Sequence, residues 1–202
     1  MYSLAEQPDV VLVQERVRLH PAFASIAFQG IPDVRVIVYR GKPAMAMLRL
    51  PTRASGGRAN LHQGGLGVGI ELATGLTHRA VQSGKRITRH PDTDVPLVDF
   101  RVPYWPRVLD IARDVARAVG LGYVGVDIVI DARRGPMLLE ANARPGLAIQ
   151  MANGRGLLPA LEAIDRGARD DEDKIVALRT RAVPTPARGA QPYRRDPVSP
   201  RP

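Results

Sequence analysis

The sequence predicts an α+β fold in which a mostly antiparallel sheet is flanked by helices. Apolar runs rich in β-branched residues come in neighbouring pairs joined by short turns, which is the pattern of antiparallel hairpins. One long stretch, residues 105–119, repeats apolar residues at three- and four-residue steps and predicts an amphipathic helix. A length of 202 residues is enough for one domain with a sizeable core.

The first strands are predicted close to the N-terminus. Residues 10–17 are a continuous apolar run that ends in polar residues, and they predict a strand. Residues 22–30 are mostly small and apolar, which indicates a short helix or a loop. Residues 31–39 and 44–50 predict a hairpin around the turn at 40–43.

Two arginines, Arg35 and Arg49, lie inside the paired strands of that hairpin. In one interpretation they belong to a solvated face of the sheet. In the other they form a pair of guanidinium groups that binds a phosphate or a carboxylate. The sequence leaves both interpretations open.

The most glycine-dense segment follows, at residues 51–69. Glycine permits positive φ angles and close approach of the backbone, so successive N–H groups beside Arg58 could cradle phosphate oxygens. Asn60 and His62 add polar side chains to the same stretch. The alternative is a flexible linker, because the segment matches neither a Walker A motif nor the dinucleotide-binding fingerprint.

Further strands are predicted at residues 68–72 and 77–88. The amphipathic helix then begins at Trp105, where Pro106 suits the first turn and Gly120 suits the position after the end. We expect this helix to pack on the hairpin that comes after it in the chain. Its predicted apolar face consists of Leu109, Ala112, Val115, Ala116 and Val119.

Two apolar runs, residues 124–130 and 137–141, flank a turn centred on Arg133-Arg134 and predict a second hairpin. Facing residues in a hairpin have a constant number sum, which is 267 for this turn. The acidic residue inside each run obeys that sum, so Asp127 faces Glu140. Asn142 lies two residues further and points to the same side.

Two carboxylates and an amide oxygen on one face form a candidate metal site. Like charges about 5 Å apart repel unless a cation lies between them, and Mg²⁺ or Mn²⁺ suits such oxygen ligands. In the alternative interpretation, Asp127 and Glu140 face solvent on an edge hairpin. The predicted apolar neighbours on the opposite side argue against it; these are Val126, Ile128, Leu139 and Ala141.

The C-terminal part is predicted to contain little regular structure. Residues 157–165 predict a short helix, and the charged run 170–174 is a candidate start of a terminal helix. From residue 183 the chain is rich in proline and arginine without an apolar period, so we expect disorder there.

Composition excludes several classes of protein. The chain has no cysteine, which excludes a disulfide framework and a thiolate zinc site. It has no signal-peptide pattern and no apolar run of about 18 residues, so we expect a cytoplasmic protein without membrane association. The net charge of +9 raises a nucleic-acid-binding alternative, but six arginines against one aspartate after residue 178 supply +5 of it. The scarcity of aromatic residues disfavours that alternative.

In order along the chain, these motifs resemble the C-terminal half of ATP-grasp ligases, closest to the RimK-type, alpha-L-glutamate ligase-like group. The likeness runs from about residue 10 to residue 158. It is carried by Val13-Gln14-Glu15, Asp33-Val34-Arg35, Arg58-Ala59-Asn60-Leu61-His62-Gln63-Gly64-Gly65, Gly125-Val126-Asp127 and residues 135–147, which read GPMLLEANARPGL.

The resemblance implies a role for each matching residue. The hinge that holds adenine corresponds to Gln14, Glu15, Arg16 and Val17. Asp33 matches an acidic position in the nucleotide site, and Arg58 and Asn60 match residues near the phosphates. The metal ligands correspond to Asp127, Glu140 and Asn142, with Glu140 between two Mg²⁺ ions. Arg35 and Arg49 correspond to the catalytic arginines, which hold phosphate or the carboxylate substrate.

The implied activity is ligation of a carboxylate to an amine, with ATP and Mg²⁺, through an acyl phosphate. The acceptor is expected to be an amino acid or a peptide. The resemblance divides the chain into the end of the lid and the hinge (1–17), the ATP-grasp C-terminal subdomain (18–168) and a charged, largely disordered tail (169–202). The fold is then incomplete at its N-terminus, and we expect either a fragment, a partner chain that supplies the lid, or a non-catalytic nucleotide-binding remnant.

Overall fold

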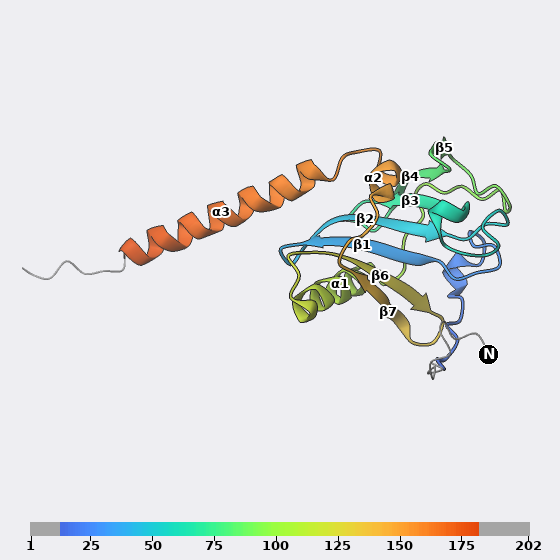
Figure 1. Cartoon of the computed structure of the whole chain (residues 1–202), viewed down its shortest axis with the longest axis horizontal. Coiled ribbons are helices and arrows are strands. Elements are labelled where there is room, and N and C mark those ends of the chain that lie inside the picture. Colours follow the sequence, from blue (N-terminus) through green and yellow to red (C-terminus); the bar gives the residue numbers. More distant parts are fainter. Residues whose placement is uncertain (1–12, 182–202) are drawn as a thin grey trace, which may run out of the picture. The chain divides into compact units, whose positions relative to one another are not determined.

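The computed structural model describes residues 13–181 (Figure 1). The chain divides into two compact units, Met1–Ile164 and Asp165–Pro202, and the first contains the whole sheet. The expected disorder from residue 183 onward concerns residues outside the described part.

The first unit is built on one seven-stranded sheet in which every neighbouring pair is antiparallel. The order across the sheet is β5-β4-β3-β2-β1-β6-β7, so β5 and β7 are its edges. This arrangement confirms the predicted α+β class. The strands are β1 (Asp33–Tyr39), β2 (Lys42–Leu50), β3 (Leu66–Ile70), β4 (Thr77–Gln82), β5 (Lys85–Ile87), β6 (Tyr123–Asp131) and β7 (Gly135–Asn142).

Two short 3-10 turns and three helices accompany the sheet. The turns are η1 (Pro21–Phe23) and η2 (Leu61–Gln63), and the helices are α1 (Trp105–Val119), α2 (Ala148–Asn153) and α3 (Leu158–Arg181). The predicted helix at Trp105 is therefore confirmed. Helix α2 was not predicted, and α3 joins the predicted short helix and the charged run into one element that also includes residues 169–181.

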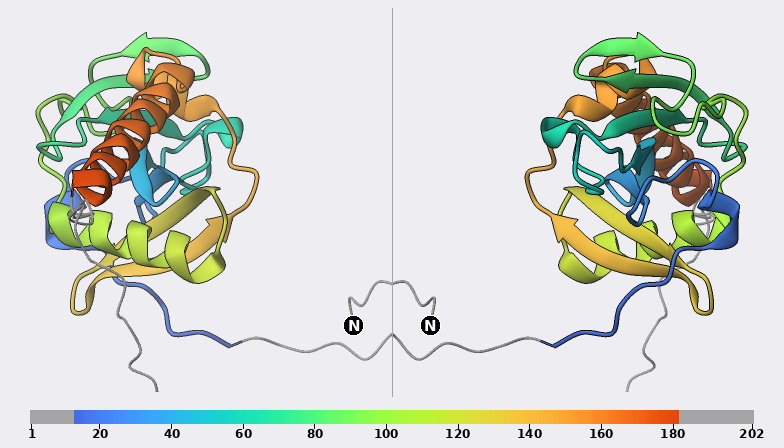
Figure 2. Two further views of the ribbon diagram at one scale, coloured as in Figure 1. Left: turned by 90° about the vertical axis from the view of Figure 1, so that its left-hand side faces the viewer. Right: turned by 90° about the vertical axis from the view of Figure 1, so that its right-hand side faces the viewer.

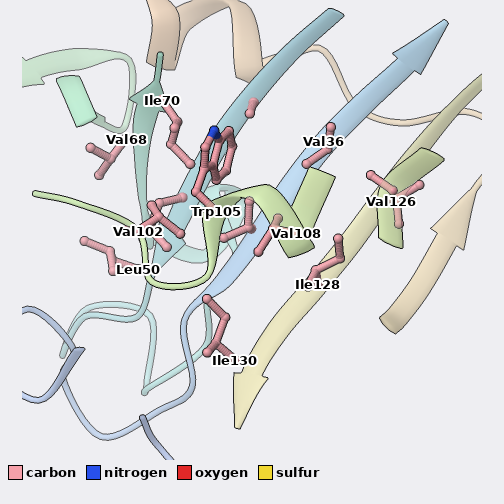
Figure 3. Packing of buried hydrophobic residues seen from close by; sticks show 14 of the residues in the cluster. Val36, Leu50, Val68, Ile70, Val102, Trp105, Val108, Val126, Ile128 and Ile130 are labelled. Atoms are coloured by element: carbon pink, nitrogen blue, oxygen red, sulfur yellow. The ribbon is translucent and has the colours of Figure 1, made fainter. Parts of the chain in front are cut away.

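The main hydrophobic core lies between the sheet and α1, which runs alongside the β6–β7 hairpin (Figure 2). Val36, Val126 and Ile128 gather with Trp105 and Val108 of the helix (Figure 3). The predicted apolar face of α1 is partly wrong. Val119 is 45% exposed, whereas Val108 is fully buried, because the buried stripe begins at Trp105 and continues through Ala112 and Ala116.

A second, smaller core lies between the opposite face of the sheet and α2. Met45 and Met47 of the sheet pack with Ile149 and Ala152 of the helix. The helix approaches β3 closely, because Gly69 has no side chain there: a Cβ at Gly69 would lie 2.6 Å from the carbonyl oxygen of Ala152.

In the β6–β7 hairpin, Asp127 faces Glu140 as predicted, but the register next to the turn differs from the predicted one. Asp131 pairs with Gly135, so the loop has three residues, and the number sum beside it is 266. A bulge between Asp127 and Ile128 shifts the sum to 267, which places Asp127 opposite Glu140. Gly125 then lies opposite Asn142.

The bulge and the edge position of β7 overturn one prediction. Leu139, expected in the core, is the extra residue of the bulge and is 55% exposed, and Ala141 is exposed as well. Neither side chain is covered, because no strand flanks β7 on its outer side within the described residues.

The predicted strand at 10–17 is wrong for the part that the structure describes. Residues 13–17 have no regular structure, and Val13 is 87% exposed. Residues 10–12 lie outside the described range. Among the described residues before β1, only Leu19 pairs with the sheet, through a single bridge to Asp131. An apolar run forms a strand only where a neighbouring strand edge is available over its length.

No helix among residues 13–181 combines the length and the apolar character needed to cross a membrane.

Substituting alanine for Gly69 should lower the free energy of unfolding by about 1–3 kcal/mol, since overpacking of this size typically costs that much. The new Cβ would meet the backbone of α2 at 2.6 Å. Gly122→Ala is the control, because a Cβ at Gly122 meets nothing within 4 Å. Urea denaturation measures both variants, and equal midpoints would contradict the close packing of α2 on β3.

Candidate functional site

Four charged side chains from three neighbouring strands form a cluster on the face of the sheet that carries α2. Asp33 and Arg35 lie on β1, Arg49 on β2 and Asp127 on β6. Asp33 is the cross-strand partner of Arg49, and Arg35 is the partner of Asp127. Alternation along each strand brings all four to the face opposite the main core.

The two arginines converge on Asp127. Arg35 donates from Nε to Oδ1 at 2.7 Å and from Nη2 to Oδ2 at 2.6 Å. Arg49 donates from Nη2 to the same Oδ2 at 2.6 Å and from Nε to Oδ1 of Asp33 at 2.5 Å. Asp127 is fully buried, and the arginine side chains are only 12% and 14% exposed. The solvated-face interpretation is therefore wrong for these three residues.

Burial and ion pairing compete in this cluster. Burial is the largest influence on Asp127 and disfavours its charge, but hydrogen bonds from Arg35 and the charges of Arg49 and Arg35 hold the pKa of Asp127 below its ordinary value. Burial raises the pKa of Asp33 to about 7, although Arg49 acts in the opposite direction. Asp127 is thus the firmly ionised member, because it receives three hydrogen bonds from two guanidinium groups and Asp33 receives one.

Glu140 and Asn142 extend the cluster toward solvent. The Glu140 side chain is 56% exposed, and its Oε1 lies 3.9 Å from Nη2 of Arg35. Asn142 donates from Nδ2 to the same Oε1 at 2.7 Å. Among the described hydrogen bonds, none uses the second carboxylate oxygen of Glu140 or the amide oxygen of Asn142. Both oxygens could serve as ligand atoms.

The donor types of this group fit a hard divalent cation, which prefers oxygen ligands. No three His, Cys, Asp or Glu residues within the described part of the chain gather into a group that could hold a metal by itself. Asp127 and Glu140 supply two carboxylates and Asn142 an amide oxygen, so a cation here would take the rest of its shell from water and from a bound phosphate. Mg²⁺ is commonly held in this way. The cation would share Asp127 with Arg35 and Arg49.

The glycine-dense loop is built into the structure, which argues against a flexible linker. Thr52 and Ser55 bond to each other through side chains and backbone, and the Thr52 hydroxyl donates to the carbonyl of Gly64 at 2.9 Å. Gly57 packs tightly against Gln29: a Cβ at Gly57 would lie 2.5 Å from the backbone carbonyl oxygen of Gln29. The loop therefore has a fixed conformation beside the end of β2.

Arg58 and Asn60 lie in this loop but do not join the charged cluster directly. The Asn60 side chain accepts a hydrogen bond from the backbone N–H of His62 at 3.0 Å and caps η2. Arg58 is exposed. No described hydrogen bond links either residue to Asp33, Arg35, Arg49 or Asp127.

A cavity of about 730 Å³ lies beside residues 15–19. Its lining includes Glu15, Arg16 and Val17 from the expected hinge, while Gln14 is not among the lining residues. The remaining wall is formed by Arg18, Leu19, Gln29, Gly30 and Ile31, and residues 29–31 lead directly into β1.

Asp131, which the sequence marks only as a turn residue, supports this wall. Its Oδ2 accepts a hydrogen bond from the backbone N–H of Arg18 at 2.7 Å. Its Oδ1 accepts from the N–H groups of Arg133 and Arg134 at 2.8 and 3.0 Å. These backbone hydrogen bonds lower the pKa of Asp131 to about 2. The only sequence signal was an aspartate at the start of a predicted turn, where local bonds to the backbone are common.

Comparison with known proteins identifies the family. The family model described as "Sugar-transfer associated ATP-grasp" matches residues 1–166, so the chain belongs to this ATP-grasp family. The expected ATP-grasp resemblance is thereby confirmed.

Curated relatives carry ligase names. A probable alpha-L-glutamate ligase of Parasynechococcus marenigrum (strain WH8102) is 32% identical over 130 residues, which is 63% of this chain and 20% of that protein. A second one, from Aeromonas salmonicida (strain A449), is 31% identical over 126 residues, 61% of this chain and 30% of the relative.

A ribosomal protein bS6–L-glutamate ligase of Salmonella paratyphi B is 33% identical over 115 residues, 57% of this chain and 27% of that protein. The matched stretch thus spans between a fifth and a third of the length of these relatives. Together, the family and the names support a ligase at the family level.

Removing the charge of Asp127 should destabilise the fold strongly, because two buried guanidinium groups lose their shared partner. We expect Asp127→Asn to lower the free energy of unfolding by about 3–5 kcal/mol. Glu140→Gln, at the exposed end of the cluster, should change it by less than about 0.5 kcal/mol. Urea denaturation of the two variants side by side measures this, and similar losses would contradict the burial of Asp127.

The lowered pKa of Asp131 predicts a pH dependence of stability. The native carboxyl has a pKa of about 2 against an ordinary value of 3.8, so the unfolded chain takes up the proton first as pH falls. The contribution of Asp131 is complete above about pH 4 and is lost as pH falls toward 2. Denaturation midpoints should fall less steeply over this range in Asp131→Asn, and parallel curves for wild type and variant would contradict it.

Proposed function

We propose that this chain is the nucleotide- and cation-binding part of an ATP-dependent carboxylate–amine ligase. One observation carries the proposal: Asp127, Glu140 and Asn142 come together in the hairpin, and two oriented arginines, Arg35 and Arg49, lie beside them. Fixed positive groups next to oxygen ligands suit a transferring phosphoryl group, whose negative charge must be held and neutralised.

In this proposal the three hairpin residues hold Mg²⁺, or Mn²⁺ in its place. Asp127 and Glu140 would be the carboxylate ligands, Asn142 would supply its amide oxygen, and Glu140 would serve both ions if two bind. A cation held there would supply positive charge that neutralises the phosphate oxygens and polarises the γ-phosphoryl group. The exposed side of Glu140 leaves room for water and phosphate in the remaining positions.

Arg35 and Arg49 act as the phosphate- and carboxylate-binding groups. Asp127 and Asp33 use Nε and Nη2 of these guanidiniums, and no described hydrogen bond uses either Nη1. The acids therefore fix the plane of each guanidinium while one nitrogen stays available. In this proposal Asp33 belongs to the nucleotide site because it accepts a hydrogen bond from Arg49 and so fixes the position of that guanidinium.

The nucleotide extends from this cluster to the cavity beside residues 15–19. Gln14, Glu15, Arg16 and Val17 hold the nucleobase end, and the last three of them line the cavity. The phosphate end is reached by Arg58, whose exposed side chain is long enough to turn toward an anion. Asn60 contributes by holding η2 and with it the backbone N–H groups of the glycine-dense loop.

The chemistry proceeds in two steps. A carboxylate oxygen of the substrate attacks the γ-phosphorus of ATP, the bond to the bridging oxygen breaks, and ADP and an acyl phosphate form. An amine then attacks the acyl carbon, inorganic phosphate leaves, and the amine loses a proton to give the amide. Both steps depend on positioning and charge neutralisation rather than on a protein nucleophile.

The names of the relatives support the proposed substrates in outline. The relatives' names specify L-glutamate ligation, in one case to ribosomal protein bS6, and the family description refers to sugar transfer. We propose a carboxylate and an amine from an amino acid or a peptide.

A second candidate function is nucleotide binding without catalysis by the chain alone. It is favoured by the short share of the relatives' length that this chain matches, 20% in one case. In that case turnover would require parts of the ligase that the matched stretch does not cover.

Isothermal titration calorimetry with ATP tests the leading proposal. We expect binding that requires Mg²⁺ and that Glu140→Gln weakens by about tenfold or more, since even outer-shell changes at metal sites cost 10–100-fold. Glu162→Gln, an exposed glutamate on α3, is the matched control. Binding that is unchanged in Glu140→Gln, or equally strong with a chelator present, would contradict the proposed cation site.

A further inference from the structure

The segment at residues 15–19 is fixed to the turn end of the β6–β7 hairpin, where the N-terminal part of the chain passes in Figure 1. The backbone N–H of Arg18 donates to Oδ2 of Asp131 at 2.7 Å, and the carbonyl of Arg18 accepts from the N–H of Ala132 at 3.0 Å. Leu19 forms an antiparallel bridge with Asp131. Two hydrogen bonds therefore hold the backbone of Arg18, and the bond from Ala132 belongs to the bridge between Leu19 and Asp131.

The position of this contact follows from the sheet. Asp131 pairs with Gly135 of β7 on one side, so Leu19 must lie on the other side, where β1 is the neighbour. The pairing of β1 with β6 begins only at Asp33 and Val129. The last residues of β6 have no β1 partner, and the chain at Arg18 and Leu19 takes that place.

A single carboxylate serves both sides of the contact. Asp131 is 5% exposed, and while one of its oxygens binds Arg18, the other accepts the two N–H groups that close the hairpin turn. An amide at this position has only one acceptor oxygen and cannot satisfy both groups of donors. Glu15 and Arg134 form a further ion pair, but both side chains are more than half exposed, and such pairs contribute little.

Asp131 and Asp127 lie on the same face of β6, four residues apart. At about 3.3 Å per residue their Cα atoms are about 13 Å apart along the strand. One strand thus carries, at fixed spacing, both Asp127 of the charged cluster and Asp131, which supports the cavity wall at residues 15–19.

We propose that Asp131 is a positioning residue for nucleotide binding, which holds residues 15–19 at the spacing from Asp127 that allows one nucleotide to reach both. This role rests on the proposed function, because it gives a purpose to the distance between the cavity and the cluster. Asp131 touches neither base nor phosphate and acts through the backbone of Arg18. A purely structural turn residue would share its bonds to Arg133 and Arg134 but would have no effect on ligand affinity.

Two variants test the contact from its two sides. Asp131→Ala removes the carboxylate. Ala132→Pro removes the N–H that binds Arg18 while keeping Asp131, and proline suits the first position of such a turn. Asp94→Asn is the control, since Asp94 is an exposed aspartate whose pairing with Arg89 is local. Urea denaturation first establishes that each variant folds, and Ala132→Pro decides the question if Asp131→Ala does not.

Two measurements are made on each folded protein: amide hydrogen exchange at Arg18 by NMR, and Mg²⁺-dependent ATP affinity by calorimetry. We expect both variants to lose protection at Arg18 and to bind ATP about tenfold more weakly or worse, while the control matches wild type. The Arg35 Nε–H resonance should stay in place, which shows that the cluster is intact.

The outcomes separate this inference from the proposed function. Lost protection with unchanged ATP affinity would overturn the positioning role and leave the proposed function standing. A wild-type Arg18 amide that exchanges freely would also overturn it. Failure of wild type to bind ATP at all would overturn the proposed function, and the positioning role with it.

Discussion

The structure depends on one buried carboxylate held by two guanidinium groups. Asp127 is inaccessible to solvent, and its charge is tolerable only because Arg35 and Arg49 donate three hydrogen bonds to it. Those bonds require β2, β1 and β6 to be adjacent and in one register, since a slip of one residue would turn each charged side chain to the apolar face. The cluster therefore constrains the centre of the sheet, and the centre of the sheet places the cluster.

The sequence predicted the meeting of Asp127 and Glu140 because strand pairing near a short turn depends on local features. The prediction was right for a partly wrong reason. The loop has three residues rather than a symmetric centre at Arg133 and Arg134, and a bulge beside Asp127 compensates for the difference. Nothing local marks that bulge. Turn residues and alternation specify which residues can face each other, but an insertion of one residue is decided by packing.

Predictions that depend on neighbours distant in sequence were less successful. Residues 13–17 look like a strand, yet the sheet offers only the end of β6 as a partner. Leu139 and Ala141 look like core residues, yet β7 is an edge. Helix α2 was missed because six residues are too few to show a helical period. Tertiary contacts hold this helix, such as the hydrogen bond that the Asn153 side-chain amide donates to the carbonyl oxygen of Ala46. The local pattern of apolar and polar residues does not predict the order of the strands in the sheet.

The charge balance of the cluster bears on how the proposed site would accept its ligand. Asp127, Glu140 and the two arginines sum to zero, and Asp33, whose pKa lies near 7, adds between zero and one negative charge. Without a bound nucleotide, Asp127 and Asp33 form ion pairs with Arg35 and Arg49. These pairs compensate the positive charge of two largely buried guanidinium groups. In the proposal, a cation and a polyphosphate would bring opposite charges to the cluster: the cation would bind Asp127, Glu140 and Asn142, and the phosphate would bind the Nη1 atoms of Arg35 and Arg49. The pre-formed ion pairs therefore keep the guanidiniums in place before binding, and less conformational freedom has to be lost when the ligand binds.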